Sequence, residues 1–209
     1  MARTDFQGSI FVPGDITLSG NIVPGISRSS IVQQDLQEYG VSFTEMRVHD
    51  ALSSLLPATA TADDLGLAGS TTYGTASPYL LSSNAGSTTV TQYARWQFQL
   101  PPEYVAGQSC RVSIHCGAGT AVSDGTMTVD VSAYLSDDEG AVSGSDLVST
   151  SATDCNSLTM STKAFVITGT TLTPGATLDC RMVAAVTDSA TATVYFKAGR
   201  VKMLLDIQG

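Results

Sequence analysis

From residue 71 onward, apolar and polar residues alternate along the chain, which is the period of a β-strand with one buried face. Turns rich in Gly or Pro, such as Pro101-Pro102, Gly117–Gly125 and Thr173-Pro174-Gly175, separate the alternating runs. About eight such strands in roughly 140 residues favour an all-β fold, an antiparallel jelly-roll β-sandwich. The residues expected to face inward, strand by strand, are Ala94, Trp96, Phe98 and Leu100; Cys110, Val112, Ile114 and Cys116; Met127, Val129, Val131, Ala133 and Leu135; Leu178, Cys180, Met182, Ala184 and Val186; Val194 and Phe196; and Val201, Met203, Leu205 and Ile207. A further short strand, Phe165-Val166-Ile167, is expected to be almost continuously apolar.

The N-terminal stretch has a different pattern, with short β-type pieces between turn signals. Val-Pro-Gly occurs at Val12–Gly14 and again at Val23–Gly25, on either side of the Gly20-Asn21 pair. Pieces this short are marginal as isolated hairpins, so their apolar side chains need another surface to cover them. We therefore expect residues 1–30 to be an extended N-terminal assembly arm with short β repeats. Its expected assembly contacts are Ile10, Phe11, Val12, Ile16, Leu18, Ile22 and Val23.

Residues 31–62 form the expected junction between this arm and the body, which spans residues 63–209. Ser29 and Ser30 can cap a short helix that Gly40 would end. We favour an extended piece at Tyr39–Phe43 and a short helix between Met46 and Leu56. A strand through Val48 remains open as an alternative, because residues 41–48 also alternate.

Composition narrows the class of protein. Charged residues make up 14% of the chain, below the roughly 25% of typical soluble domains, and Ser and Thr replace them. The net charge is −9, and the 10 Lys and Arg residues are dispersed, so no nucleic acid is expected as a partner. No apolar run approaches the roughly 20 residues that a membrane helix needs, and residues 1–7 do not open a signal peptide. We expect neither a membrane partner nor a secretory route.

The four cysteines are Cys110, Cys116, Cys155 and Cys180. Cys110 and Cys116 point to the same face of one strand but lie roughly 20 Å apart along it, too far to pair with each other. No Cys-x-x-Cys spacing for zinc occurs. We expect free, buried thiols rather than a framework of disulfides.

Few residues suggest chemistry. His49 and His115 have no Cys or carboxylate at ligand spacing, and no Gly-x-Ser-x-Gly motif or phosphate loop occurs. We therefore expect no catalytic, metal or cofactor-binding residues, and no enzyme activity.

Three weaker candidates for binding sites remain. The acidic loop Asp137-Asp138-Glu139, with Asp146, has the oxygen ligands of a calcium site, although a solvated turn is the simpler interpretation. Trp96 suits a sugar site, but its place among inward-facing residues favours a core anchor. Tyr73, Tyr79 and Tyr93 are candidates for an exposed binding surface or a subunit contact.

Several segments also carry a resemblance. The run from Arg95 to Tyr104, RWQFQLPPEY, and the run from Leu172 to Leu178, LTPGATL, resemble the jelly-roll bodies of tailed-phage head-decoration (cement) proteins and fibre-like structural proteins. The run from Gly14 to Ile22, GDITLSGNI, is similar to the short β repeats of phage fibre shafts. The run from Glu45 to Leu52 is similar to the junction before such a body.

The resemblance implies a virion structural protein, commonly a homotrimer. The leading hypothesis is a capsid decoration protein, made in the host cytoplasm, that sits on the exterior of the capsid and bridges major capsid protein subunits of the same virion. The alternative is a tail-fibre or baseplate receptor-binding module that grips a host glycan. A glycan hydrolase on a β scaffold is a third hypothesis, which the lack of an acid or nucleophile motif disfavours.

Overall fold

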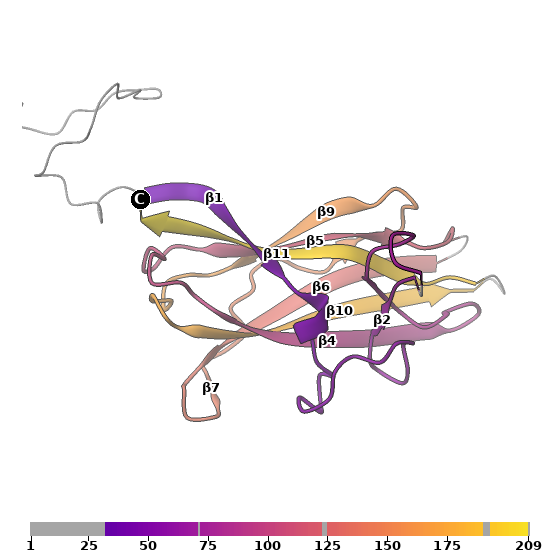
Figure 1. The fold of residues 1–209 in the computed structure, drawn as a ribbon, viewed down its shortest axis with the longest axis horizontal. Coiled ribbons are helices and arrows are strands. Elements are labelled where there is room, and N and C mark those ends of the chain that lie inside the picture. Colours follow the sequence, from indigo (N-terminus) through magenta and orange to yellow (C-terminus); the bar gives the residue numbers. More distant parts are fainter. Residues whose placement is uncertain (1–31, 71, 123–124, 190–192, 209) are drawn as a thin grey trace, which may run out of the picture.

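The computed structural model describes residues 32–70, 72–122, 125–189 and 193–208 (Figure 1). The expected assembly arm, with Ile10, Phe11, Val12, Ile16, Leu18, Ile22 and Val23, lies outside the described residues. In chain order the elements are β1 (Val32–Val41), the short 3-10 helix η2 (Phe43–Glu45), β2 (Gly66–Ala68), β3 (Tyr79–Leu81), β4 (Thr89–Gln99), β5 (Cys110–Ala118), β6 (Gly125–Ser136), β7 (Val142–Ser143), β8 (Thr153–Asp154), β9 (Ser161–Ile167), β10 (Thr177–Asp188) and β11 (Phe196–Gln208).

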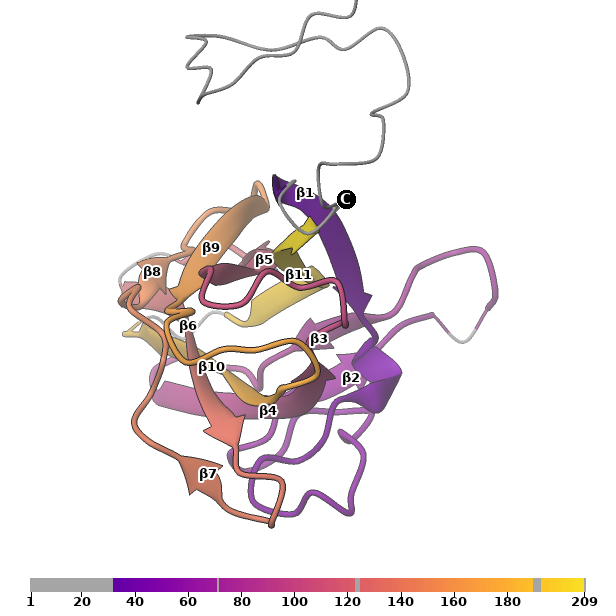
Figure 2. The ribbon, with the colours of Figure 1, turned by 90° about the vertical axis from the view of Figure 1, so that its left-hand side faces the viewer.

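The strands form two antiparallel sheets that pack face to face. One sheet has the order β2-β3-β11-β5-β9, with β1 also paired to β11, and the other has the order β4-β10-β6-β7, with β8 also paired to β6. Figure 2, which looks along the strands, shows the layer of β9, β5 and β11 above the layer of β6, β10 and β4. The expected all-β sandwich is confirmed.

The connections between the sheets are those of a jelly roll. Early strands pair antiparallel with late ones in reverse order: β3 with β11, β4 with β10, β5 with β9 and β6 with β8. Most successive strands therefore cross from one sheet to the other, which is the double Greek-key arrangement. For such strands to pair correctly, each one must turn its apolar face towards the core.

The core between the sheets holds the residues that alternation predicts. Val112 and Ile114 on β5, and Met182 and Ala184 on β10, are fully buried. The inward faces of β6 and β11 are buried as well, except that Leu135 and Ile207 are only half-buried, and Phe98 on β4 is also half-buried. Trp96 is 2% exposed, so it is a core residue, as its position in the alternation favours.

The helix expected after Ser29 and Ser30 is wrong, because Val32–Val41 is strand β1, which runs antiparallel to β11. Gly40 pairs with Lys202 inside this strand and does not end it. The helix expected between Met46 and Leu56 is also wrong, since this segment contains turns and isolated bridges, and the single 3-10 turn precedes it at Phe43–Glu45.

Tertiary pairing explains these differences. A ladder with β11 provides backbone hydrogen bonds that a short, weakly capped helix cannot match in water. Within the described part of the chain, no helix has both the length and the apolar character needed to cross a bilayer.

Candidate functional site

Polar side chains gather where residues 46–65 cover the free edge of β4. The N–H of Arg47 donates to the carbonyl of Arg95 at 2.8 Å, and the N–H of Arg95 donates back at 3.0 Å. Two residues away on the same edge, the N–H of Tyr93 donates to the carbonyl of Asp63 at 2.8 Å, and the N–H of Leu65 donates to the carbonyl of Tyr93 at 2.9 Å. Because both segments pair with one strand, the side chains that follow Arg47 meet those around Asp63.

The result is a cluster of one imidazole and three carboxylates. His49 Nε2 lies 3.3 Å from Asp63 Oδ2, and His49 Nδ1 lies 3.6 Å from Asp64 Oδ1. Ligand atoms of His49, Asp50 and Asp64 all lie within 4.8 Å of one another. The side chains of His49 and Asp64 are 16% and 14% exposed, while that of Asp63 is 48% exposed. We call these four residues the His49 cluster.

Two atoms of the His49 cluster lack hydrogen-bond partners. His49 Nδ1 and Asp64 Oδ1 are buried, and neither has a partner within hydrogen-bonding distance. A buried polar atom without a partner costs roughly 1–3 kcal/mol, so such atoms are rare outside functional sites.

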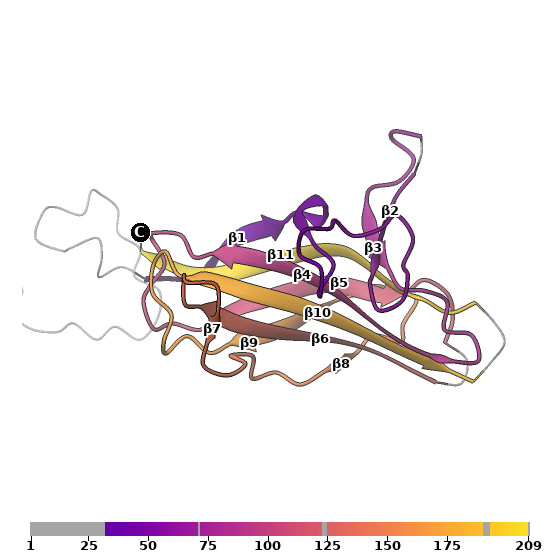
Figure 3. The same cartoon turned by 90° about the horizontal axis from the view of Figure 1, so that it is seen from below.

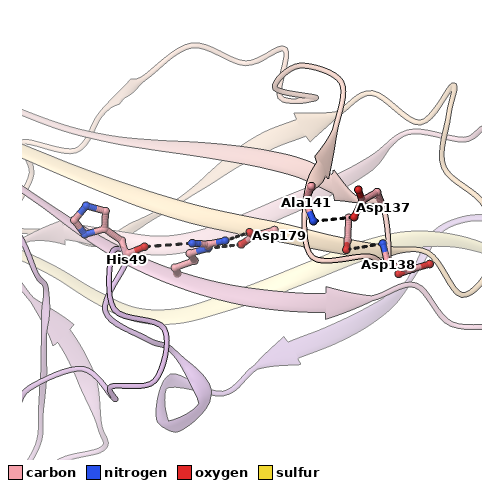
Figure 4. Close-up of polar contacts among 7 residues, drawn as sticks. His49, Asp137, Asp138, Ala141 and Asp179 are labelled. Atoms are coloured by element: carbon pink, nitrogen blue, oxygen red, sulfur yellow. Dashed lines mark hydrogen bonds and ion pairs between the residues drawn. The ribbon is translucent and has the colours of Figure 1, made fainter.

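The neighbouring charges are held by other contacts. The Arg95 guanidinium donates from Nε to Asp179 Oδ1 at 2.6 Å and forms a second bond from Nη2 to Oδ2 (Figure 4). Its Nη1 donates to the carbonyl oxygen of His49 at 3.3 Å. Hydrogen bonding to Asp179 raises the pKa of Arg95, so the guanidinium keeps its charge in this bidentate pair. Arg95 thereby fixes the backbone of His49 and leaves the imidazole to the carboxylates.

Tyr93 forms the floor beneath the imidazole. The two rings lie 4.4 Å apart between centroids with an interplanar angle of 37°, and the Arg181 guanidinium lies 5.0 Å from the centre of the Tyr93 ring. The imidazole is therefore fixed by a ring contact as well as by its charged neighbours.

A hollow of about 490 Å³ opens next to Trp96 on the same edge of β4. Its walls are Glu45, Arg47, Leu52, Ser53, Trp96 and Gln97. Trp96 Nε1 itself is buried in the protein and has no hydrogen-bond partner. This volume lies in the range of roughly 300–1,000 Å³ that small-molecule pockets occupy.

The three tyrosines expected to share an exposed surface have separate surroundings. Tyr73 is fully exposed on the connection between β2 and β3, which projects from the body (Figure 3). Tyr79 is half-buried on β3, with Lys197 Nζ 4.1 Å from its ring centre. Tyr93 packs on His49 as described above. The structure therefore does not bring the three together.

The acidic loop is a backbone-capped turn. Asp137 Oδ1 accepts the N–H groups of Glu139 and Ala141 at 2.9 and 2.8 Å, and these bonds lower the pKa of Asp137 (Figure 4). Asp146 Oδ1 instead accepts the N–H groups of Ala133 and Val148, both at 3.0 Å. The structure does not bring Asp146 together with Asp137–Glu139 as a ligand set, which supports the solvated-turn interpretation.

All four cysteines are free and buried, as expected. Burial raises the pKa of the Cys110 thiol to about 12 and the pKa of Cys180 well above its usual value. Cys116 and Cys155 are hydrogen-bonded to each other, and this bond lowers the pKa of Cys116 while it raises that of Cys155. Cys110 and Cys180 are therefore unreactive core thiols at neutral pH.

The sequence analysis missed the carboxylates near His49. Asp63 and Asp64 follow His49 by fourteen and fifteen residues, a spacing that matches no local ligand motif. Their meeting depends on two separate pairings with β4, which no local pattern predicts.

No protein-family model matches the chain, and no curated protein matches it. Among solved structures it is similar to a family 16 carbohydrate-binding module, with 14% identity, a TM-score of 0.38, and 71% of this chain and 89% of that chain covered. It is also similar to the N-terminal modules of endo-1,4-β-D-xylanase 10B from Clostridium thermocellum, solved with xylohexaose. There the identity is 11%, the TM-score is 0.41, and 80% of this chain spans 27% of that one.

A structure of infectious bursal disease virus matches with 16% identity, a TM-score of 0.33, and 74% of this chain and 42% of that chain covered. The neighbours thus include carbohydrate-binding and viral proteins of β-sandwich type.

Proposed function

We propose that this chain is a virion structural protein that decorates the exterior of a phage capsid and bridges major capsid protein subunits of the same virion. The observation that best supports the proposal is the attachment of β1. This strand begins at Val32, directly after the apolar arm, and pairs with β11 at Val32–Gln33 and again from Gln37 to Val41, with an irregularity between them. The arm is thereby joined to a central strand of the body.

The pairing suits a load-bearing attachment. β11 pairs with β1, β3 and β5, so it lies inside the six-stranded sheet. Antiparallel hydrogen bonds run perpendicular to the strands, so a pull along β1 loads many of them at once. Tyr39 on β1 also packs edge-on against Phe98 of β4, with ring centroids 5.8 Å apart, which ties the attachment to the second sheet. An arm held this way can transmit force from a capsid surface to the whole sandwich.

The arm itself supplies the proposed contact with the capsid. Its apolar residues alternate with polar ones at Ile16, Thr17, Leu18 and Ser19, so one face can be buried against a partner. A stable interface buries about 1,600 Å² in total, and repetition over a lattice multiplies the contact.

The test compares capsid binding by the intact chain, a chain lacking residues 1–30, and two arm variants. The first variant changes Ile16, Leu18 and Ile22 to Ser, and its matched control changes Thr17, Ser19 and Asn21 to Ala. We expect the deletion and the Ser variant to lose at least tenfold in affinity for undecorated capsids in co-sedimentation, while the control binds as the intact chain does. Unchanged binding by the truncated protein would refute the proposal.

A second candidate function, a glycan-binding module, rests on the hollow beside Trp96. Arg47 and Gln97 on its walls carry groups that can bind sugar hydroxyls there. A glycan array followed by titration calorimetry tests it. The glycan hypothesis requires a hit that weakens at least tenfold in Arg47→Ala but not in Arg200→Ala, whose side chain is exposed on β11. An array without hits removes this candidate.

A further inference from the structure

We infer that the His49 cluster binds a divalent transition-metal ion, with Zn²⁺ the best fit, and that the ion fastens residues 46–65 to the edge of β4. The ligands are His49 Nδ1, a carboxylate oxygen of Asp64 and one of Asp50, with water completing the coordination. This inference concerns the folded body and does not depend on binding to a capsid.

The spacing of the ligand atoms fits an ion between them. Ligands that lie about 2.1 Å from a tetrahedral zinc ion are about 3.4 Å from each other. His49 Nδ1 and Asp64 Oδ1 are 3.6 Å apart, and the ligand atoms of His49, Asp50 and Asp64 all lie within 4.8 Å of one another. The side chains therefore need only small adjustments to take up the ion.

The two unpartnered atoms are the ones that the ion would contact. His49 Nδ1 and Asp64 Oδ1 are buried without a hydrogen-bond partner. A cation between them satisfies both at once, whereas a proton on Nδ1 faces an oxygen at 3.6 Å, beyond hydrogen-bonding distance.

Asp63 occupies the position of an outer partner. Metal-binding histidines usually donate their second ring N–H to a carboxylate, which fixes the ring and its tautomer. Asp63 Oδ2 lies 3.3 Å from Nε2, on the side of the ring away from Asp64. The stacking of Tyr93 on the imidazole holds the same orientation.

Local charge also favours a cation. The cluster has three carboxylates and one imidazole, and the nearest guanidinium groups have other contacts, since Arg95 binds Asp179 and Arg181 lies over Tyr93. An imidazole nitrogen with carboxylate oxygens is a donor set for zinc rather than for calcium or magnesium, which take oxygen ligands almost exclusively.

The experiment uses the full chain, stripped of metals with EDTA and then titrated with ZnCl₂ by calorimetry. We expect one zinc ion per chain, and a rise in Tm of about 5–10 °C at a hundredfold excess over Kd. His49→Gln and Asp64→Asn should each weaken binding at least tenfold. His115→Gln should not, because His115 lies on β5, where its Nδ1 is 3.3 Å from Thr162 Oγ1.

Wild-type protein provides a readout that needs no substitution. In ¹⁵N NMR spectra, zinc should shift the Nδ1 resonance of His49 and leave both ring nitrogens of His115 unchanged. The inference is overturned if wild-type protein takes up no zinc, if the His49 resonances do not respond, or if His115→Gln weakens binding as much as His49→Gln does.

Discussion

Gln92 is a fully buried polar side chain on the inward face of β4, and its amide group is hydrogen-bonded within the protein. Its Oε1 accepts the N–H of Ser83 at 2.6 Å, and its Nε2 donates to the carbonyl of Ala62 and to Ser83 Oγ, both at 2.9 Å. Gln92 therefore joins β4 to the segment after β3 and to the end of the junction. Such a network is stable only while every member has a partner.

The first prediction follows from this network. Gln92→Leu keeps the size of the side chain but leaves the Ser83 N–H and the Ala62 carbonyl without partners. We expect a loss of about 2–3 kcal/mol in the free energy of unfolding, measured by urea denaturation. Gln97→Leu, at an exposed position of the same strand, should change it by less than about 0.5 kcal/mol. Equal effects of the two substitutions would contradict the role assigned to Gln92.

Because the Cys110 thiol is buried, the free energy of unfolding should fall as the pH becomes alkaline. Its pKa is about 12 in the folded protein because of burial, against about 8.5 for an unfolded thiol. A raised pKa means that its contribution is complete below about pH 8.5 and is lost as the pH rises towards 12. Between pH 8 and 10.5 we expect this thiol to account for a loss of about 2 kcal/mol, measured from urea midpoints.

The matched control for this prediction is Cys110→Ala. This variant should be less stable at pH 8, because it leaves a cavity, but its stability should fall less steeply with pH than that of the wild type. Identical pH profiles would show that the Cys110 thiol has the same pKa in the folded and the unfolded protein, which would contradict the prediction.

At the scale of elements, the loop before β5 packs tightly against the loop after β9. A Cβ on Gly169 would lie 1.6 Å from the carbonyl oxygen of Gln108, so no side chain fits there without a shift of the backbone. Two further bonds hold these loops, from the N–H of Leu172 to Gly169 at 2.8 Å and from the N–H of Gly107 to Leu172 at 3.0 Å. This end of the sandwich is closed by main-chain contacts.

Two glycine substitutions test this packing. Gly169→Ala should cost about 2 kcal/mol or more, because the clash is with backbone atoms that cannot rotate away. Gly40→Ala, within β1, has no atom within 4 Å of the added carbon and should be neutral or stabilising by about 0.5 kcal/mol. Thermal denaturation of both variants measures the difference, and a tolerated Gly169→Ala would show that these loops are loosely packed.

The limits of sequence-based prediction also lie at the level of elements. The inward faces of β5 and β10 were predictable because a period of two is a local property of the chain, visible at Val112, Ile114, Met182 and Ala184. Strand β1 was not predictable from the capping residues at its start, since its conformation depends on pairing with residues some 160 positions later. The His49 cluster was missed for the same reason.

At the scale of the whole molecule, the resemblance to phage head proteins predicts a homotrimer in solution. Burial of one polar outer sheet face between copies would keep the arm of each copy free for a shell. Native mass spectrometry of the purified chain should show an oligomer of three copies. The same measurement on the chain lacking residues 1–30 should show whether the arm or the body holds the trimer together. A monomer at micromolar concentration would contradict this prediction.

The pairing of Val32 with Gln208 places the entry to the body beside its carboxyl terminus. If the chain decorates a capsid as proposed, a foreign antigen or purification tag grafted beside Gln208 would crowd β1, the tether of the arm. The connection between β2 and β3 projects from the body far from the start of β1 (Figure 3). A graft there would leave the tether unobstructed. The connection between β2 and β3 is therefore the better site for such a graft.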